Sequence, residues 1–264
     1  MNNQFRYTAP ADEKPLDNLV TDGGYASIFR TVAFVGDSLS SGEFETFDPE
    51  KNERHYYDMF EYSWGQFAAR MAGFTAYNFS RGGMTASEYC ESYAAAKDWW
   101  HPALKTQAYV IALCVIDLIN AGQPVGEMSD INPEDPTKNA KTFTGYYARV
   151  IQQYKAIQPD AKFFLLTMPR EDRGHGEDHP MSRILADYAA RIRELAEYFD
   201  NTYVIDLHTY APPQDKDYFH LFYLHGHMSP MGYRVVAEQI CSYIDYIIRK
   251  HPADFCKGIA FVVM

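Results

Sequence analysis

Five short apolar runs, separated by longer segments of helical spacing, constrain the fold of this chain more than any other feature. In length and apolar character the runs are typical of buried strands. They cover residues 31–36, 74–78, 107–113, 162–167 and 202–207. Helical spacing is found between them, near residues 60–72, 85–97, 139–157 and 181–199. The order βαβαβαβαβ predicts a parallel sheet, and right-handed crossovers place helices on both of its faces.

A final helix follows the last run and has its own start signal. Ser229 can cap this helix, and Pro230 suits its first turn. One apolar face continues at helical spacing through Val236, Ile240, Ile244 and Ile247. Because no linker is visible, we expect a single domain over residues 25–264. Residues 1–24 are expected to form a partly irregular N-terminal arm.

Charge and composition exclude several classes of protein. The chain has 35 acidic and 24 basic side chains, for a net charge of -11, which argues against a nucleic acid partner. No stretch approaches the roughly 20 apolar residues of a membrane span, and the N-terminus has neither the basic start nor the apolar run of a secretory signal. We therefore expect a cytoplasmic protein. Its four cysteines form no C-x-x-C pair, so reduced thiols are the default.

The first candidate for chemistry lies where the first run ends. Residues 34–41 read Phe-Val-Gly-Asp-Ser-Leu-Ser-Ser, and a turn at the carboxyl end of a parallel strand would bring Ser38 to the rim of the sheet. The backbone N–H of Ser38 would face the same space, which suits a nucleophile that has its own oxyanion donor. A Gly-Asp-Ser tripeptide alone is more often a simple turn or helix cap.

Two further segments support a functional interpretation of this tripeptide. Residues 78–85 read Asn-Phe-Ser-Arg-Gly-Gly-Met-Thr, and two glycines directly after a strand allow a tight turn with available N–H groups. Near the C-terminus, His227 precedes the capped helix in the segment His-Met-Ser-Pro-Met-Gly-Tyr. A lone histidine is usually a surface or packing residue, so only its position relative to the other segments makes His227 a candidate.

In this order the three segments resemble the GDSL esterases of the SGNH hydrolase superfamily, from Val35 to about Ala237. The resemblance implies a flavodoxin-like three-layer α/β/α sandwich with a five-stranded parallel sheet of order 2-1-3-4-5, and neither metal nor cofactor. It also implies that Ser38 is the nucleophile and His227 the general base. The backbone N–H groups of Ser38 and Gly83 would hold the oxyanion.

The sequence departs from the family pattern after the third strand. The family usually has Gly-x-Asn-Asp there, and its asparagine supplies a further oxyanion donor, whereas this chain has Cys114, Val115, Ile116 and Asp117. Ile116 cannot donate a hydrogen bond, and the loss of one such donor typically costs on the order of 10²–10³ in turnover. We expect Asp117 to bond nearby backbone. Cys114 is either a reactive thiol or, more commonly, a small buried hydrophobe.

A second departure lies beside the histidine. The family often has an aspartate three residues earlier, where this chain has Leu224. That acid would fix the tautomer of the base and stabilise its cation. In its absence we expect a backbone carbonyl of Leu224 or a neighbour to orient Nδ1 of His227, which leaves a Ser38–His227 dyad. Asp206 is a conceivable distant orienter, although a turn role at a strand end is the simpler interpretation.

A metal site is a competing interpretation of the same region. His225 and His227 form a His-x-His pair, and Asp206 and His208 lie nearby in sequence. These residues do not have the spacing of a usual ligand set, so we expect no metal.

Long loops after the first and fourth strands, at residues 40–60 and 169–179, are predicted to form the substrate surface, with residues 48–54 as a solvated loop. Their polar and aromatic content favours a small-molecule substrate, a short acyl ester of a polar alcohol such as an acetylated sugar. Two other functions stay open. One is a catalytically silent relative that binds an esterified carbohydrate or a protein, and the other is a nucleotide-binding protein, which no phosphate-binding motif supports. The sequence leaves the oligomeric state open.

Overall fold

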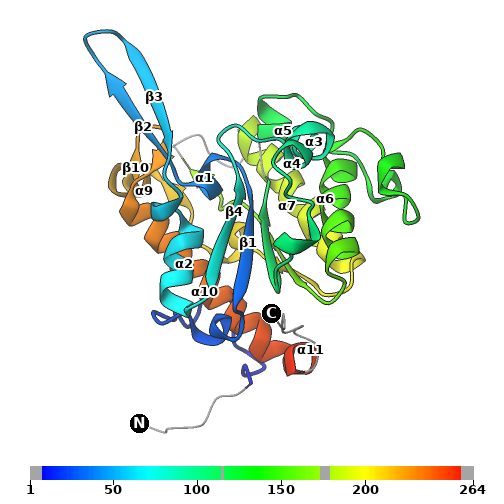
Figure 1. Cartoon of the computed structure of the whole chain (residues 1–264). Helices are drawn as coiled ribbons and strands as arrows, with labels where there is room; N and C mark the ends of the chain where they lie inside the picture. The colour runs from blue at the N-terminus through cyan, green and yellow to red at the C-terminus, as the bar shows by residue number, and fades with distance from the viewer. Residues whose placement is uncertain (1–7, 114–115, 173–178, 257–264) are drawn as a thin grey trace, which may run out of the picture.

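A five-stranded parallel sheet lies at the centre of the computed structural model, which describes residues 8–113, 116–172 and 179–256 (Figure 1). Its strands are hydrogen-bonded in the order β4-β1-β5-β6-β8. Their bounds are β1 (Thr31–Gly36), β4 (Thr75–Ser80), β5 (Ala108–Ala112), β6 (Lys162–Leu166) and β8 (Thr202–Ile205). Counted among these five strands alone, the order is 2-1-3-4-5. The α/β fold and its strand order are therefore confirmed.

The strand register brings the predicted functional segments to one edge of the sheet. Gly36, at the end of β1, pairs with Ser80 of β4 on one side and with Ala112 of β5 on the other. The carboxyl ends of these three neighbouring strands are therefore level. Ligands of open parallel sheets bind at this edge.

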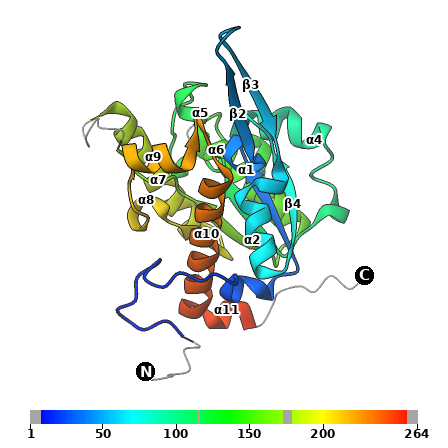
Figure 2. The same ribbon diagram turned by 90° about the vertical axis from the view of Figure 1, so that its left-hand side faces the viewer.

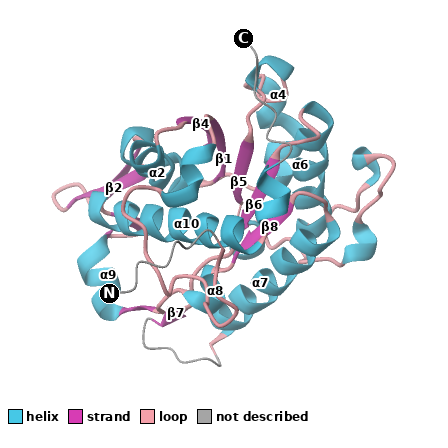
Figure 3. Ribbon diagram, turned by 90° about the horizontal axis from the view of Figure 1, so that it is seen from below, coloured by secondary structure: helices cyan, strands magenta, loops and turns pink. Residues whose placement is uncertain are grey.

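Helices cover both faces of the sheet, as Figure 3 shows from below. In β1, Val32 and Phe34 face the layer that contains α2 (Trp64–Ala72) and α10 (Pro230–Lys250). Ala33 and Val35 face the opposite layer, with α6 (Phe143–Ile157) and α7 (Pro180–Tyr198). Alternate residues of a strand point to opposite faces, so a strand that is apolar throughout can fill two cores.

The four predicted helical segments are confirmed, with differences at their ends. Residues 60–72 form a 3-10 turn, η2 (Phe60–Tyr62), and then α2, which Ser63 caps. Residues 85–97 form one helical stretch with a π-helical centre: α3 (Ala86–Glu88), η3 (Tyr89–Tyr93) and α4 (Ala94–Ala96). The other short helices are η1 (Gly24–Ile28), α1 (Ser38–Ser41), η4 (Pro102–Leu104), α5 (Ile116–Ile119), η5 (Met128–Asp130), η6 (Pro136–Lys138), α8 (Leu207–Tyr210), α9 (Lys216–Phe222) and α11 (Pro252–Cys256).

The last helix, α10, is formed as predicted and anchors the N-terminal segment. Ser229 caps it by accepting the N–H of Gly232 at 3.2 Å, and Pro230 occupies its first turn. The N-terminal segment runs along its lower half (Figure 2), where Arg249 forms ion pairs with Glu13 and Asp245.

A β-hairpin extends from the body beside the carboxyl edge of the sheet (Figures 1 and 2). It consists of β2 (Glu43–Asp48) and β3 (Glu53–Asp58), paired antiparallel along their whole length. The prediction of a solvated loop over residues 48–54 was therefore wrong at both ends, since only residues 49–52 form the turn. Every residue of β3 is exposed, so no apolar alternation marks it in the sequence.

A second, smaller hairpin packs against the first. It consists of β10 (Tyr223–Leu224) and β11 (His227–Met228), and both of its strands contact β2. Farther along the edge, β7 (Glu171–Asp172) pairs in parallel with β9 (Gln214–Asp215). In the part of the chain that the structure describes, no helix combines the length and the apolar character needed to cross a membrane.

Candidate active site

Ser38 begins a single helical turn directly after β1. The Asp37 side chain caps this turn by accepting the N–H of Leu39 at 3.1 Å, and its carbonyl accepts the N–H groups of Ser40 and Ser41. The cap fixes Ser38 as the first residue of α1. The N–H of a first helical residue has no acceptor inside its own helix, so it is available to a ligand.

The glycine turn after β4 lies next to the Ser38 turn. The N–H of Arg81 donates to the carbonyl of Gly36 at 3.3 Å, which continues the β1–β4 ladder past the end of the strand. Gly83 then adopts a φ of 69°, in the left-handed region that favours glycine. The turn ends where Thr85 caps α3 by accepting the N–H of Glu88.

Asp117 of α5 bonds the backbone where the glycine turn ends. Both carboxylate oxygens of this buried residue accept the N–H of Ala86, at 2.8 and 3.0 Å. Burial raises the pKa of Asp117 to about 7, although these backbone hydrogen bonds act to lower it. Asp117 therefore bonds nearby backbone, as predicted. Ile116 is the half-buried first residue of α5, and Cys114 lies outside the described residues.

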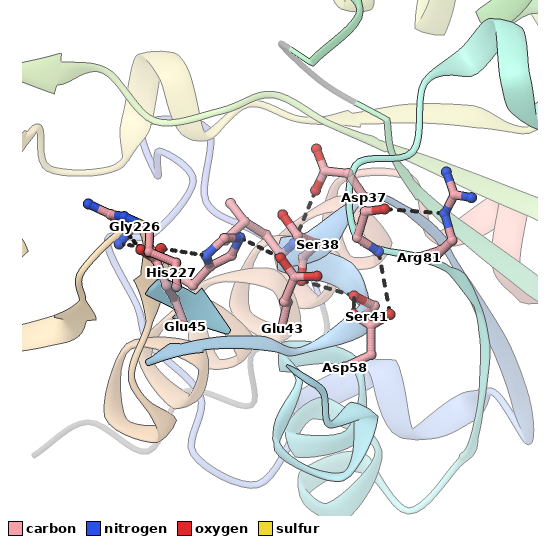
Figure 4. A network of polar contacts seen from close by, with 12 residues as sticks. Asp37, Ser38, Ser41, Glu43, Glu45, Asp58, Arg81, Gly226 and His227 are labelled. Carbon is pink, nitrogen blue, oxygen red and sulfur yellow. Dashed lines mark hydrogen bonds and ion pairs between the residues drawn. The ribbon is translucent and has the colours of Figure 1, made fainter. Parts of the chain in front are cut away.

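His227 comes from the small hairpin, whose strand β11 contacts α1. Its side chain is 15% exposed. Figure 4 shows its ring near Ser38 and in polar contact with Glu43 and Glu45. Two sequence segments that are 189 positions apart, at Ser38 and His227, thus meet at the carboxyl edge of the sheet.

The group that contacts Nδ1 of His227 differs from the prediction. Leu224 pairs with His227 across the small hairpin and is 44% exposed, but Nδ1 lies 3.2 Å from Oε2 of Glu45. The expectation of a backbone carbonyl at this nitrogen was wrong, because β2 brings a carboxylate to the ring from elsewhere in the chain.

The second ring nitrogen also faces a carboxylate, since Nε2 of His227 lies 3.0 Å from Oε1 of Glu43. Burial acts to lower the pKa of His227, but the hydrogen bonds to Glu43 and Glu45 outweigh it and raise the pKa above its ordinary value. Neither acid was predicted from the sequence. The spacing of Glu43 and Glu45 was the available signal, since residues i and i+2 of a strand point to the same face, while Phe44 between them points to the other.

Glu43 also lies against the glycine turn. A Cβ built on Gly82 would overlap Oε2 of Glu43, so this carboxylate sits between the turn and the His227 ring. Asp58 of β3 connects α1 to the glycine turn, since it accepts the hydroxyl of Ser41 and lies 3.5 Å from the N–H of Gly82. Figure 4 shows this polar network, in which Glu45 and Glu43 contact the His227 ring and Asp58 contacts Ser41 and Gly82.

The other candidates from the sequence are not part of this network. Asp206 caps α8 and pairs with Arg193 at 2.8 Å, which fits its role at a strand end. The ring of His225 lies 6.2 Å from that of Phe47. Within residues 8–113, 116–172 and 179–256, no group of three or more His, Cys, Asp or Glu side chains is arranged to hold a metal ion.

Solved structures of several ester hydrolases resemble this one. A possible lipase from Chitinophaga pinensis superposes with a TM-score of 0.53 at 17% identity, over 84% of this chain and 98% of that one. An acetyl xylan esterase gives 0.51 at 19% identity, over 81% and 99% of the two chains. A family two carbohydrate esterase from Clostridium thermocellum, solved in complex with cellohexaose, gives 0.53 at 17% identity, over 90% and 67%. At these identities the likeness concerns the fold.

The sequence itself supplies the assignment. A comparison with curated proteins gives no match. The model of the GDSL-like Lipase/Acylhydrolase family, however, matches residues 34–235, which include the Ser38 turn, the glycine turn and His227. This chain therefore belongs to the GDSL-like lipase/acylhydrolase family, and it is a carboxylic ester hydrolase by family.

Proposed function

We propose that this protein is a serine esterase that removes short acyl groups, acetyl above all, from a polar alcohol such as a carbohydrate. One observation carries the proposal: the helical turn that begins with Ser38 contacts the strand that holds His227, at the edge where the glycine turn also ends. A nucleophile, a base and backbone donors are the parts that acyl transfer requires.

In the proposed reaction, Oγ of Ser38 attacks the ester carbonyl and gives its proton to Nε2 of His227. The negative charge that develops on the carbonyl oxygen is held by the N–H groups of Ser38 and Gly83. Collapse of this intermediate breaks the bond to the alcohol, which leaves with the proton from His227. Water, activated by the same nitrogen, then hydrolyses the acyl-enzyme and regenerates Ser38.

The substrate class is inferred from the surroundings of the site. The hairpin β2–β3 presents an exposed aromatic ring beside His227, since the ring of Tyr56 lies 5.8 Å from the imidazole, centroid to centroid. Exposed aromatic faces and polar groups suit a sugar ring better than a long acyl chain. Two of the structurally similar proteins are an acetyl xylan esterase and a carbohydrate esterase, which supports the same choice.

The decisive experiment compares the wild type with Ser38→Ala on a small activated acetate ester and on acetylated xylan. The wild type should release acetate and react with a fluorophosphonate at Ser38, whereas Ser38→Ala should do neither and should melt like the wild type. Unchanged turnover in Ser38→Ala would refute the assignment of the nucleophile.

A non-catalytic binding protein is the second candidate, and two observations favour it. Ile116 offers no side-chain donor to the oxyanion, and Nε2 of His227 faces Glu43 in this structure. If this alternative holds, Ser38 will not react with a fluorophosphonate under conditions that modify a known serine esterase. The same protein should still bind acetylated oligosaccharides in calorimetry.

A further inference from the structure

Glu45 is a buried acidic residue, and a buried carboxylate requires specific partners. It is 3% exposed, on the face of β2 that meets the small hairpin. Burial of an unpaired carboxylate is strongly unfavourable, so such a residue must be fully partnered. Glu45 has three partners. Oε2 accepts the N–H of Gly226 at 2.9 Å and lies 3.2 Å from Nδ1 of His227, and Oε1 forms an ion pair with Arg54.

The partners of Glu45 keep it ionised. Burial acts to raise the pKa of Glu45, but the hydrogen bonds from His227, Gly226 and Arg54 outweigh it and lower the pKa below its ordinary value. The backbone is shaped for this contact, because a Cβ on Gly226 would lie 2.5 Å from Oε2 of Glu45. A larger residue at position 226 would push the carboxylate away from the histidine.

From this geometry we infer that Glu45 is the acid that positions His227 for catalysis, in the place of the aspartate that Leu224 replaces. An ionised carboxylate at Nδ1 holds the proton on that nitrogen and leaves the lone pair on Nε2, where the base must accept the proton of Ser38. It also stabilises the imidazolium that forms after this transfer. The site is then a triad of Ser38, His227 and Glu45, with the acid supplied by a hairpin.

Glu43 does not fill this role, although it contacts the same ring. It faces Nε2, the nitrogen that must turn to Ser38, so it competes with the nucleophile. The other charged groups at this place are Arg54 and Asp58 of β3. Arg54 pairs with Glu45, and Asp58 bonds Ser41 and Gly82. Of these groups, Glu45 alone contacts Nδ1.

This inference rests on the proposed function, and its test separates the two. Glu45→Gln keeps the size of the side chain and removes its charge, and Glu50→Gln makes the same change in the exposed turn of the same hairpin. We expect Glu45→Gln to lower kcat by about tenfold or more, with KM nearly unchanged because Glu45 does not reach the substrate. The acid limb of the kcat/KM profile should move to lower pH. Glu50→Gln should match the wild type in all three quantities.

A measurement without substrate completes the test. The ring nitrogens of His227 are titrated by NMR in Ser38→Ala protein, with and without Glu45→Gln. Loss of the carboxylate should lower the pKa of His227 and increase the share of the tautomer with its proton on Nε2. If Ser38 is inert in the wild type, the proposed function fails, but this titration still tests the role of Glu45.

Two results would overturn the inference. One is a folded Glu45→Gln protein with wild-type kcat and pH profile, which would mean that Glu45 only pins the small hairpin. The other is an unchanged titration of His227. If Glu45→Gln does not fold, Arg54→Gln provides the test from an exposed position: it loosens the carboxylate without emptying its site, and kcat should fall in the same direction but by less. A wild-type kcat in folded Arg54→Gln would then count against the inference.

Discussion

Oε1 of Glu43 lies 3.0 Å from Nε2 of His227, whereas Glu45 contacts the other ring nitrogen, Nδ1. The imidazole is therefore held between two carboxylates from one strand, and its pKa is raised because their hydrogen bonds outweigh burial. A protonated imidazole cannot accept the Ser38 proton. In the proposed mechanism Glu43 therefore favours a resting form of the site, and His227 can act as the base once its ring is neutral and leaves Glu43.

The first prediction concerns Glu43→Ala. Removal of this carboxylate should lower the pKa of His227, so that a larger fraction of the ring is neutral at pH 6. Each pKa unit changes the neutral fraction roughly tenfold when the ring is mostly protonated, so kcat/KM at pH 6 should rise by about 2- to 10-fold. The measurement is the pH profile of kcat/KM, with Glu50→Ala as the matched control. An acid limb that stays at the wild-type pH would show that Glu43 does not govern the base.

The sequence predicted the sheet because its strands carry their own signal. After the half-buried Thr31, the runs that became β1 and β5 are buried on both faces, and the strand-end positions of Ser38 and Gly83 follow from the same pattern. The hairpin β2–β3 has no such signal, since β3 is exposed along its whole length and is placed by its pairing with β2. Glu45 is 182 positions from His227, and no local spacing connects residues so far apart.

The second prediction separates the two histidines of the small hairpin. His227→Ala should remove most of the turnover, because it deletes the proposed base. His225→Ala should be mild, since the His225 ring packs against Phe47 and stays outside the polar network. Steady-state kinetics on an activated acetate ester would measure both. Equal losses in the two variants would revive a joint role for the pair, and metal analysis of the wild-type protein would be the next step.

The third prediction concerns the contact between Asp117 and Ala86. Asp117→Ala leaves the buried N–H of Ala86 without its acceptor, which should lower the free energy of unfolding by about 1–3 kcal/mol. Asp117→Asn keeps an acceptor and should lose less. Urea denaturation of the wild type and both variants would measure these differences. Equal stability of all three proteins would show that this contact does not hold the glycine turn.

The same residue makes stability depend on pH. Because folding raises the pKa of Asp117 from its ordinary value of 3.8 to about 7, its contribution is fully present below pH 3.8 and is lost as pH rises through 7. The amide that Asp117→Asn introduces does not titrate. This variant should therefore gain stability relative to the wild type between about pH 4 and pH 7. Denaturation curves at pH 5 and pH 8 would test the sign, and a constant difference would contradict it.

The last prediction restores a donor. Ile116 begins α5 directly after the loop that follows β5, at the edge that also holds Ser38 and Gly83. If this position keeps the family geometry, an amide here would face the oxyanion of the proposed mechanism, and Ile116→Asn should raise kcat more than it changes KM. One such donor contributes about 2.7–4 kcal/mol at most. We expect less, since Ile116 is half-buried and an unpaired amide there would cost stability.

Steady-state kinetics and thermal melting of Ile116→Asn would separate these two effects. Ile116→Ala is the matched control, because it removes the same apolar contacts without adding a donor. A gain in kcat for Asn but not for Ala would assign the effect to the amide. A folded Ile116→Asn protein with unchanged or lower kcat would mean that the oxyanion is held without this position, by the backbone groups of Ser38 and Gly83 alone.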